Sequence, residues 1–241
     1  MVLQESTILQ GRYNIQRVLG EAGPIDITYL ATDNQDDKDV IIREYFPIAL
    51  AEREENDSCK ALEPDAYAYG LAEYELEGNA LQRLAHPNIT PCTDQFNENE
   101  TIYRVSERLI GISLRAYLRQ SGGKVSEDAA LDLIWPIMEG LESGHQFGLV
   151  HGSLSETSVF FDRGKTPKLF NFHAARLFTA QLTGNIKEVR VKGFSPPEIK
   201  SDREQIGSWS DVYSVAALIY YMMTGRALPT VIYPSHHERL L

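Results

Sequence analysis

The sequence contains few cysteines: only Cys59 and Cys92 occur among its 241 residues. They lie far apart, so they form neither the closely spaced ligand pairs of a zinc site nor a disulfide framework. Disulfides persist mainly in oxidising compartments, so we expect both thiols to be reduced in a cytoplasmic protein. The low cysteine content argues against a small secreted domain held together by disulfides.

Basic residues are also scarce. The chain has 23 lysines and arginines against 34 aspartates and glutamates, which gives a formal net charge of −11. A surface that binds nucleic acid needs concentrated positive charge to neutralise phosphates. We therefore expect no nucleic-acid partner. Small acidic clusters at residues 33–39 and 52–57 are interpreted as solvated loops.

Long hydrophobic runs are absent too. The sequence has no stretch of eighteen apolar residues and no signal peptide, so it predicts no membrane segment. Its longest apolar stretch, residues 212–223, is typical of a buried central helix. Hydrophobic residues make up 43% of the chain, which is enough for a packed core and excludes an intrinsically disordered protein.

The hydrophobic pattern of the first part of the chain is that of strands. Apolar residues alternate over residues 13–18 and run together at 40–42, which predicts strands within residues 11–45. Two further strands should flank the polar turn at residues 97–99. Residues 47–65 show no period and are predicted to form a loop.

Helical patterns follow. Ser113 and Ser126 are good N-caps, and Gly122 is a good helix stop. The predicted helices span residues 66–84, 113–122, 126 to about 146, and about 210–224. Strands followed by helices predict an α+β fold.

Short motifs follow one another in a fixed order along nearly the whole chain. They are Gly11 to Gly20, Val40-Ile-Ile-Arg-Glu-Tyr-Phe-Pro47, Glu77 with His86-Pro-Asn-Ile89, Tyr103 to Arg108, Leu149-Val-His-Gly-Ser-Leu154, Asn171-Phe-His173, Pro196-Pro-Glu198, and Asp211-Val-Tyr-Ser214. In this order they resemble the landmarks of the protein kinase family. The Glu-Tyr-Phe-Pro form is similar to that of bacterial serine/threonine kinases.

The resemblance implies a bilobal protein-kinase-like fold. Residues 1–108 would form an N-lobe with a five-stranded sheet and the helix that carries Glu77. Residues 109–241 would form a helical C-lobe. This second lobe would be incomplete, because kinases continue with further helices beyond the one expected at residues 210–224.

The positions that carry kinase chemistry are changed. By resemblance, Ser153 stands where the family has the aspartate that accepts the substrate proton, and Ser155 stands at the lysine of the same loop. Ser158 and Asn171 stand at the two magnesium ligands. A serine hydroxyl has too high a pKa to replace a carboxylate base, and neutral groups hold magnesium poorly. Glu156 is the only nearby carboxylate that could serve an atypical reaction.

The phosphate-binding loop is also degenerate. Gly20 and Gly23 remain from the three glycines of the family, and Asp26 stands where the third would be. A carboxylate at that point would repel phosphates. Pro24 removes a backbone donor from the tip of the loop.

The adenine slot is expected to be filled. Ile41 and Phe160 would each add carbons, one above and one below the purine. We therefore expect the slot to be collapsed, and neither ATP nor magnesium to bind. The small Ser106 at the back of the slot leaves some room behind it.

Other positions retain the family's frame. Arg43 stands at the family's phosphate-contacting lysine, and we predict that it forms a structural ion pair with Glu77. The resemblance places five further residues in the regulatory spine and its anchor. They are Leu81, Cys92, His151, Phe172 and Asp211.

A retained frame with altered chemistry predicts a pseudokinase. It would act as a protein-binding scaffold or allosteric regulator in bacterial signalling, without a cofactor or metal. Two alternatives stay open: an atypical phosphoryl or nucleotidyl transferase, and a nucleotide sensor that binds without catalysis.

Overall fold

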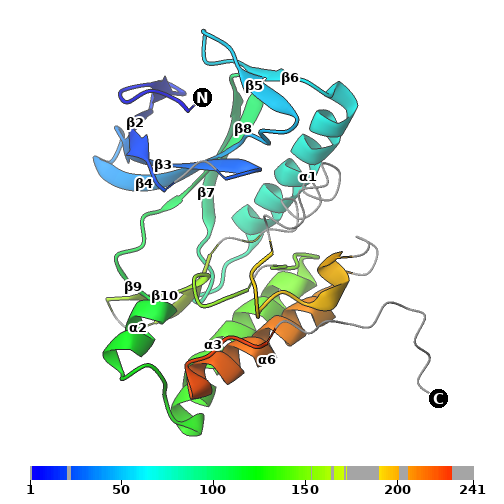
Figure 1. The fold of residues 1–241 in the computed structure, drawn as a ribbon. Coiled ribbons are helices and arrows are strands. Elements are labelled where there is room, and N and C mark those ends of the chain that lie inside the picture. Colours follow the sequence, from blue (N-terminus) through cyan, green and yellow to red (C-terminus); the bar gives the residue numbers. More distant parts are fainter. Residues whose placement is uncertain are drawn as a thin grey trace, which may run out of the picture.

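The alternating apolar residues of the first part of the chain form one antiparallel sheet in the computed structural model (Figure 1). The structure describes residues 2–20, 23–152, 154–163, 166–170, 172, 190–200 and 206–229. The sheet has six strands in the order β1-β2-β3-β4-β8-β7. Their bounds are Ile8–Leu9 for β1, Tyr13–Val18 for β2, Asp26–Asp33 for β3, Lys38–Tyr45 for β4, Cys92–Glu98 for β7 and Thr101–Glu107 for β8.

The five predicted strands are confirmed, and β1 is an addition. β1 is a two-residue edge strand that pairs with β2, which is too short to produce an alternating pattern. The predicted loop over residues 47–65 was wrong in part, because it contains the hairpin of β5 (Ala51–Arg53) and β6 (Cys59–Ala61). Strands of three residues hold at most one alternation, so the sequence pattern could not reveal them.

The predicted helices are confirmed, with shifts of a few residues at their ends. They are α1 (Pro64–Arg83), α2 (Leu114–Gln120), α3 (Glu127–Gln146) and α6 (Ser208–Thr224). The Ser113 hydroxyl accepts from Ala116 N at 3.2 Å, and the Ser126 hydroxyl accepts from Ala129 N at 3.3 Å. Both serines therefore act as the N-caps that the sequence predicted.

A second, small sheet lies at the base of the first. Its strands are β9 (Gly111–Ser113), β10 (Val159–Asp162) and β11 (Pro167–Leu169), in the order β11-β10-β9. A Cβ atom at Gly111 would lie 1.9 Å from the carbonyl oxygen of Phe161. Only glycine allows β9 to approach β10 this closely. A short 3-10 helix, η1, spans Pro197–Lys200.

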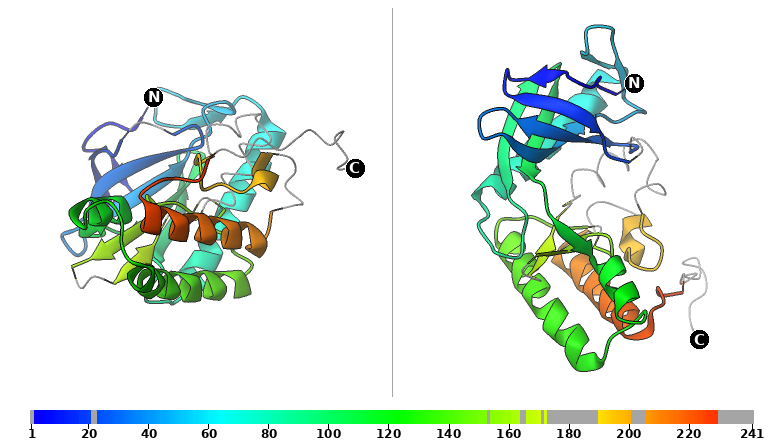
Figure 2. Two further views of the ribbon diagram at one scale, coloured as in Figure 1. Left: turned by 60° about the horizontal axis from the view of Figure 1, so that its bottom comes forward. Right: turned by 90° about the vertical axis from the view of Figure 1, so that its left-hand side faces the viewer.

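The buried side chains form two clusters that α1 connects. One lies within the large sheet and includes Tyr29, Ile42 and Tyr74, the last from α1. The other includes Leu81 from the following turns of α1 and Leu218 from α6. Helices α3 and α6 pack side by side below the sheet in each view (Figures 1 and 2). Within the described ranges, no helix has both the length and the apolar character needed to cross a membrane.

Candidate functional site

A cavity of about 330 Å³ lies between the large sheet and the small one. Ile41 of β4 and Ser106 of β8 line it from the large sheet, and Phe160 of β10 lines it from the small sheet. Its volume falls at the lower end of the range for ligand pockets, roughly 300–1,000 Å³. The cleft that the family resemblance implied is therefore present and open.

The predicted collapse of this slot was wrong. Ile41 and Phe160 both border the open cavity, and both are only half-buried. The Phe160 ring meets Phe170 edge to face, with centroids 6.4 Å apart. Phe170 also lines the cavity, so both rings of this pair border the open space.

The ion pair at Glu77 is formed by an arginine that the sequence analysis did not select. Arg104 Nη1 lies 2.6 Å from Glu77 Oε1, and both residues are buried. Arg104 Nη2 also donates to the carbonyl oxygen of Tyr74, and its guanidinium lies 3.4 Å from the centroid of the Tyr74 ring. The predicted Arg43–Glu77 pair was therefore wrong in its cation.

The order of the strands explains why Arg104, and not Arg43, pairs with Glu77. Arg43 of β4 and Arg104 of β8 are register neighbours, so they project from the same face of the sheet. Helix α1 packs against β7 and β8, which brings Glu77 to Arg104. Burial alone would lower the pKa of Arg104, but the Glu77 carboxylate outweighs this effect and keeps that pKa raised. An arginine between the apolar residues Tyr103 and Val105 of a strand was the signal that could have identified this residue.

The degenerate catalytic positions lie partly outside the described residues. Ser153 and Asn171 lie outside the described residues, so their place at the family's acidic positions rests on the sequence resemblance alone. Ser155 and Ser158 are buried. The Ser155 amide donates to the Ser158 hydroxyl at 3.2 Å, and the Ser155 hydroxyl lies 2.9 Å from that of Thr157. These hydroxyls thus bond within their own turn, and neither Ser155 nor Ser158 lines the cavity.

Glu156 is held by an ion pair outside the lining of the cavity. Its side chain is buried and does not line the cavity. Its Oε1 pairs with Nη2 of Arg115 from α2. Its other carboxylate oxygen, Oε2, is buried and has no hydrogen-bond partner among the described residues.

The glycine loop positions lie in the connection between β2 and β3. Gly20 has a left-handed backbone with φ 77°. The Gly23 amide donates to the Asp26 carbonyl oxygen at 3.0 Å. Asp26 is buried at the start of β3 and is not among the residues that line the cavity. The structure therefore does not place this carboxylate in the cavity wall.

The residues predicted for the spine and its anchor are buried. The rings of His151 and Phe172 have centroids 4.9 Å apart, and Leu81 and Cys92 lie in the same cluster as Phe172. Asp211 of α6 accepts from the backbone amides of His151 and Gly152, each at 2.8 Å. The loop that ends at Gly152 is thereby fastened to α6.

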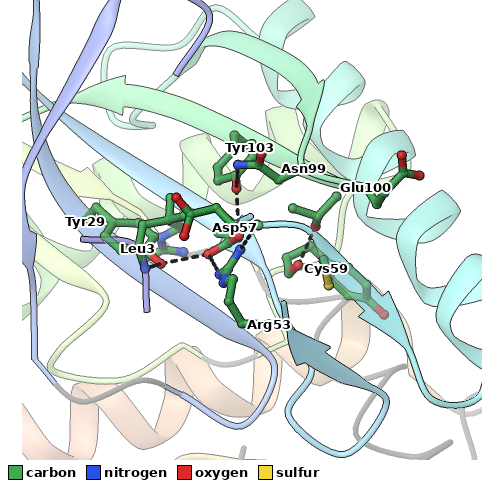
Figure 3. A network of polar contacts seen from close by, with 12 residues as sticks. Leu3, Tyr29, Arg53, Asp57, Cys59, Asn99, Glu100 and Tyr103 are labelled. Carbon is green, nitrogen blue, oxygen red and sulfur yellow. Dashed lines mark hydrogen bonds and ion pairs between the residues drawn. The ribbon is translucent and has the colours of Figure 1, made fainter. Parts of the chain in front are cut away.

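A buried polar network behind the sheet was not predicted. Glu44 follows Arg43 on β4, so the two side chains point to opposite faces. Arg53 Nη2 lies 2.6 Å from Glu44 Oε2, and the hydroxyls of Tyr29 and Tyr103 each donate to the same carboxylate at 2.8 Å. Figure 3 shows Tyr29, Arg53 and Tyr103 converging from different elements. The network fixes the β5–β6 hairpin to the sheet and holds β4 in place.

Comparisons with known proteins agree with this geometry. The family described as "Protein kinase domain" matches residues 48–237. Serine/threonine-protein kinase pkn2 of Myxococcus xanthus is 27% identical over 94% of this chain and 26% of its own length. Serine/threonine-protein kinase PkaA of Streptomyces coelicolor is 34% identical over 62% of this chain and 28% of its own length. The chain thus spans less than a third of the length of these relatives.

Comparison with solved structures finds the same fold. "PpkA-294 apo form" has a TM-score of 0.78 and 25% identity, covering 95% of this chain and 80% of that chain. The PknI kinase domain of Mycobacterium tuberculosis has a TM-score of 0.65 and 16% identity, covering 94% of this chain and 79% of that chain. Because the family match covers more than half of the sequence and the fold agrees, the chain belongs to the protein kinase domain family.

Proposed function

We propose that this member of the kinase family is catalytically inactive and acts by binding protein partners, as a scaffold or allosteric regulator in bacterial signalling. One observation carries the proposal. Among the described residues that line the cavity, the only carboxylate is Glu107. Its side chain is half-exposed at the rim and lies 3.4 Å from Nζ of Lys168. No described carboxylate is placed in the interior to accept a proton or hold a metal.

The lack of acidic groups extends to metal binding. The described part of the chain contains no group of three or more histidines, cysteines, aspartates or glutamates that could hold a metal ion. The remaining candidate, Asn171, is a neutral amide in the sequence. Magnesium prefers hard, anionic oxygens and otherwise keeps its water. The magnesium-dependent chemistry of the family therefore lacks support here.

A nucleotide sensor is the second candidate. The open cavity removes the steric argument against a bound purine. An atypical transferase is less well supported, because Glu156 is buried and paired with Arg115. The two cysteines are buried and free, which agrees with the cytoplasmic location that we propose.

A thermal-shift titration with ATP, with and without magnesium, separates these candidates. A ligand that binds only the folded state adds about 2.7 kcal/mol at one hundred times its dissociation constant. We expect no magnesium-dependent shift. A shift that is independent of magnesium would replace the proposal with the sensor, and a magnesium-dependent shift together with ADP formation would replace it with the transferase.

A further inference from the structure

Helix α1 has an outer face opposite the one that packs on the large sheet. The buried face includes Tyr67, Tyr74 and Leu81, and the helix packs against β7 and β8 along one side of the sheet (Figure 1). On the outer face, exposed residues occur at alternating steps of four and three, which keep side chains in one line along a helix. We call this the outer line of α1; its members are Asp65, Tyr69, Ala72, Leu76, Asn79 and Arg83.

The outer line combines exposed apolar residues with opposite charges at its two ends. Tyr69 is 47% exposed and Leu76 is 63% exposed, and the small Ala72 lies between them. Asp65 lies in the first turn of the helix and Arg83 in the last turn. These two charges suit the helix dipole. The dipole gives no reason for large apolar side chains to be exposed on the same line, and such a line is typical of helices that pair with another helix.

The outer line is complementary to itself when it is read in the opposite direction. If two copies of α1 pair antiparallel, the first residue of the line faces the last, the second faces the fifth, and the third faces the fourth. These pairs are Asp65 with Arg83, Tyr69 with Asn79, and Ala72 with Leu76. Each end then forms an ion pair, and at the centre a small residue receives a large one. A two-fold axis creates every contact twice.

The charges of the outer line favour this arrangement over the alternatives. A parallel pair of α1 helices would bring Asp65 against Asp65 and Arg83 against Arg83, so like charges would repel at both ends. Neither residue forms an ion pair with another described residue of its own chain. Both charges are therefore available to a second copy.

One residue beside the outer line opposes the pairing. Glu75 is exposed next to Leu76, and in the antiparallel pair the two Glu75 side chains approach each other near the two-fold axis. Glu73, on the other flank, is half-buried and has a contact within its own chain. Removing the charge of Glu75 should therefore strengthen self-association, whereas it would weaken binding to a partner with a basic face.

We propose that α1 is a self-association surface, through which two copies of this chain pair their outer lines antiparallel. Each α1 remains attached to its own sheet by Glu77 and Arg104. The inference goes beyond the proposed function and holds whether or not the chain transfers phosphate. One helix from each copy forms a small interface, so we expect a weak dimer with a dissociation constant in the micromolar range.

Sedimentation equilibrium of the complete chain tests the proposal. We expect a concentration-dependent equilibrium between monomer and dimer. Arg83→Glu and Asp65→Arg each convert both terminal ion pairs into repulsive contacts, so each should weaken the dimer about tenfold. An equimolar mixture of these two variants restores both ion pairs in a heterodimer and should associate as tightly as the natural sequence. Arg119→Glu makes the same reversal at an exposed arginine in the last turn of α2 and should leave association unchanged.

Two further variants test the centre of the pair. Leu76→Asp should abolish the dimer while the circular dichroism spectrum stays unchanged, because this side chain is exposed in the single chain. Glu75→Gln should tighten the dimer several-fold. A chain that stays monomeric at millimolar concentration, a mixture that associates no better than its separate variants, or a weaker dimer in Glu75→Gln would overturn the inference. Phosphate transfer is measured separately, so activity would refute the proposed function without altering the sedimentation result.

Discussion

Arg104 Nη1 lies 2.6 Å from Glu77 Oε1, so the cation that holds α1 comes from β8 and not from the strand that carries Arg43. In this arrangement the helix is held by two residues that both belong to the protein core. This contact between α1 and β8 is made entirely by residues of the chain itself.

Because Arg104 rather than Arg43 pairs with Glu77, substitutions of these two arginines should lower the free energy of unfolding by unequal amounts. Arg104→Met should lower the free energy of unfolding by about 3–5 kcal/mol, because it leaves the Glu77 carboxylate buried without its partner. Arg43→Met should cost clearly less, since Arg43 is only half-buried. The double variant Arg104→Met, Glu77→Met should recover part of the loss. Urea unfolding measures all three, and equal losses for Arg43→Met and Arg104→Met would speak against the assignment.

The network around Glu44 predicts a second set of stability effects. Tyr103→Phe removes a hydrogen bond to a buried carboxylate and should cost about 1.5–3 kcal/mol. Arg53→Met should cost more, about 3–5 kcal/mol, because a buried charge loses its counter-ion. Tyr220→Phe at an exposed position of α6 is the control and should have little effect. Chemical denaturation of the set would contradict the account if Tyr103→Phe behaved like Tyr220→Phe.

His151 predicts a dependence of stability on pH. Burial lowers the pKa of this imidazole below its ordinary value of 6.5. As the pH falls below about 6.5, the unfolded chain takes up the proton before the folded chain does, so the free energy of unfolding must decrease. The contribution of His151 to the free energy of unfolding is complete above about pH 6.5 and is lost progressively below that pH.

This contribution amounts to at most about 1.4 kcal/mol per pH unit from one group. Unfolding free energies measured between pH 5 and 7.5 should therefore fall less steeply in His151→Gln than in the natural sequence. An identical slope in the two proteins would show that His151 does not titrate in this way.

The secondary structure was largely predictable, for local reasons. The caps Ser113 and Ser126 each act within three residues of their own position, so a short stretch of sequence contains the whole signal. The helices and the longer strands carry enough apolar residues to show a period. β1, β5 and β6 have two or three residues each, and no period exists at that length.

The geometry of the candidate site depends on contacts between residues that lie far apart in the sequence. Choosing Arg104 over Arg43 as the partner of Glu77 required knowing which strand lies beneath α1. The open cavity is bordered by residues from β3, β4, β8 and β10, so its size depends on how these strands are placed. Residue volumes alone favoured collapse and gave the wrong result. Three-dimensional packing, rather than residue type, decides both features.

The most direct test of the central claim is phosphate transfer from radiolabelled ATP in the presence of magnesium, with the protein in excess over nucleotide. The account predicts no incorporation or hydrolysis above background, and no change in Glu156→Gln. Loss of a general base alone typically costs about 10²–10⁴-fold, and the neutral Asn171 removes a metal ligand as well. Incorporation above background that disappears in Glu156→Gln would contradict the account and establish an atypical enzyme.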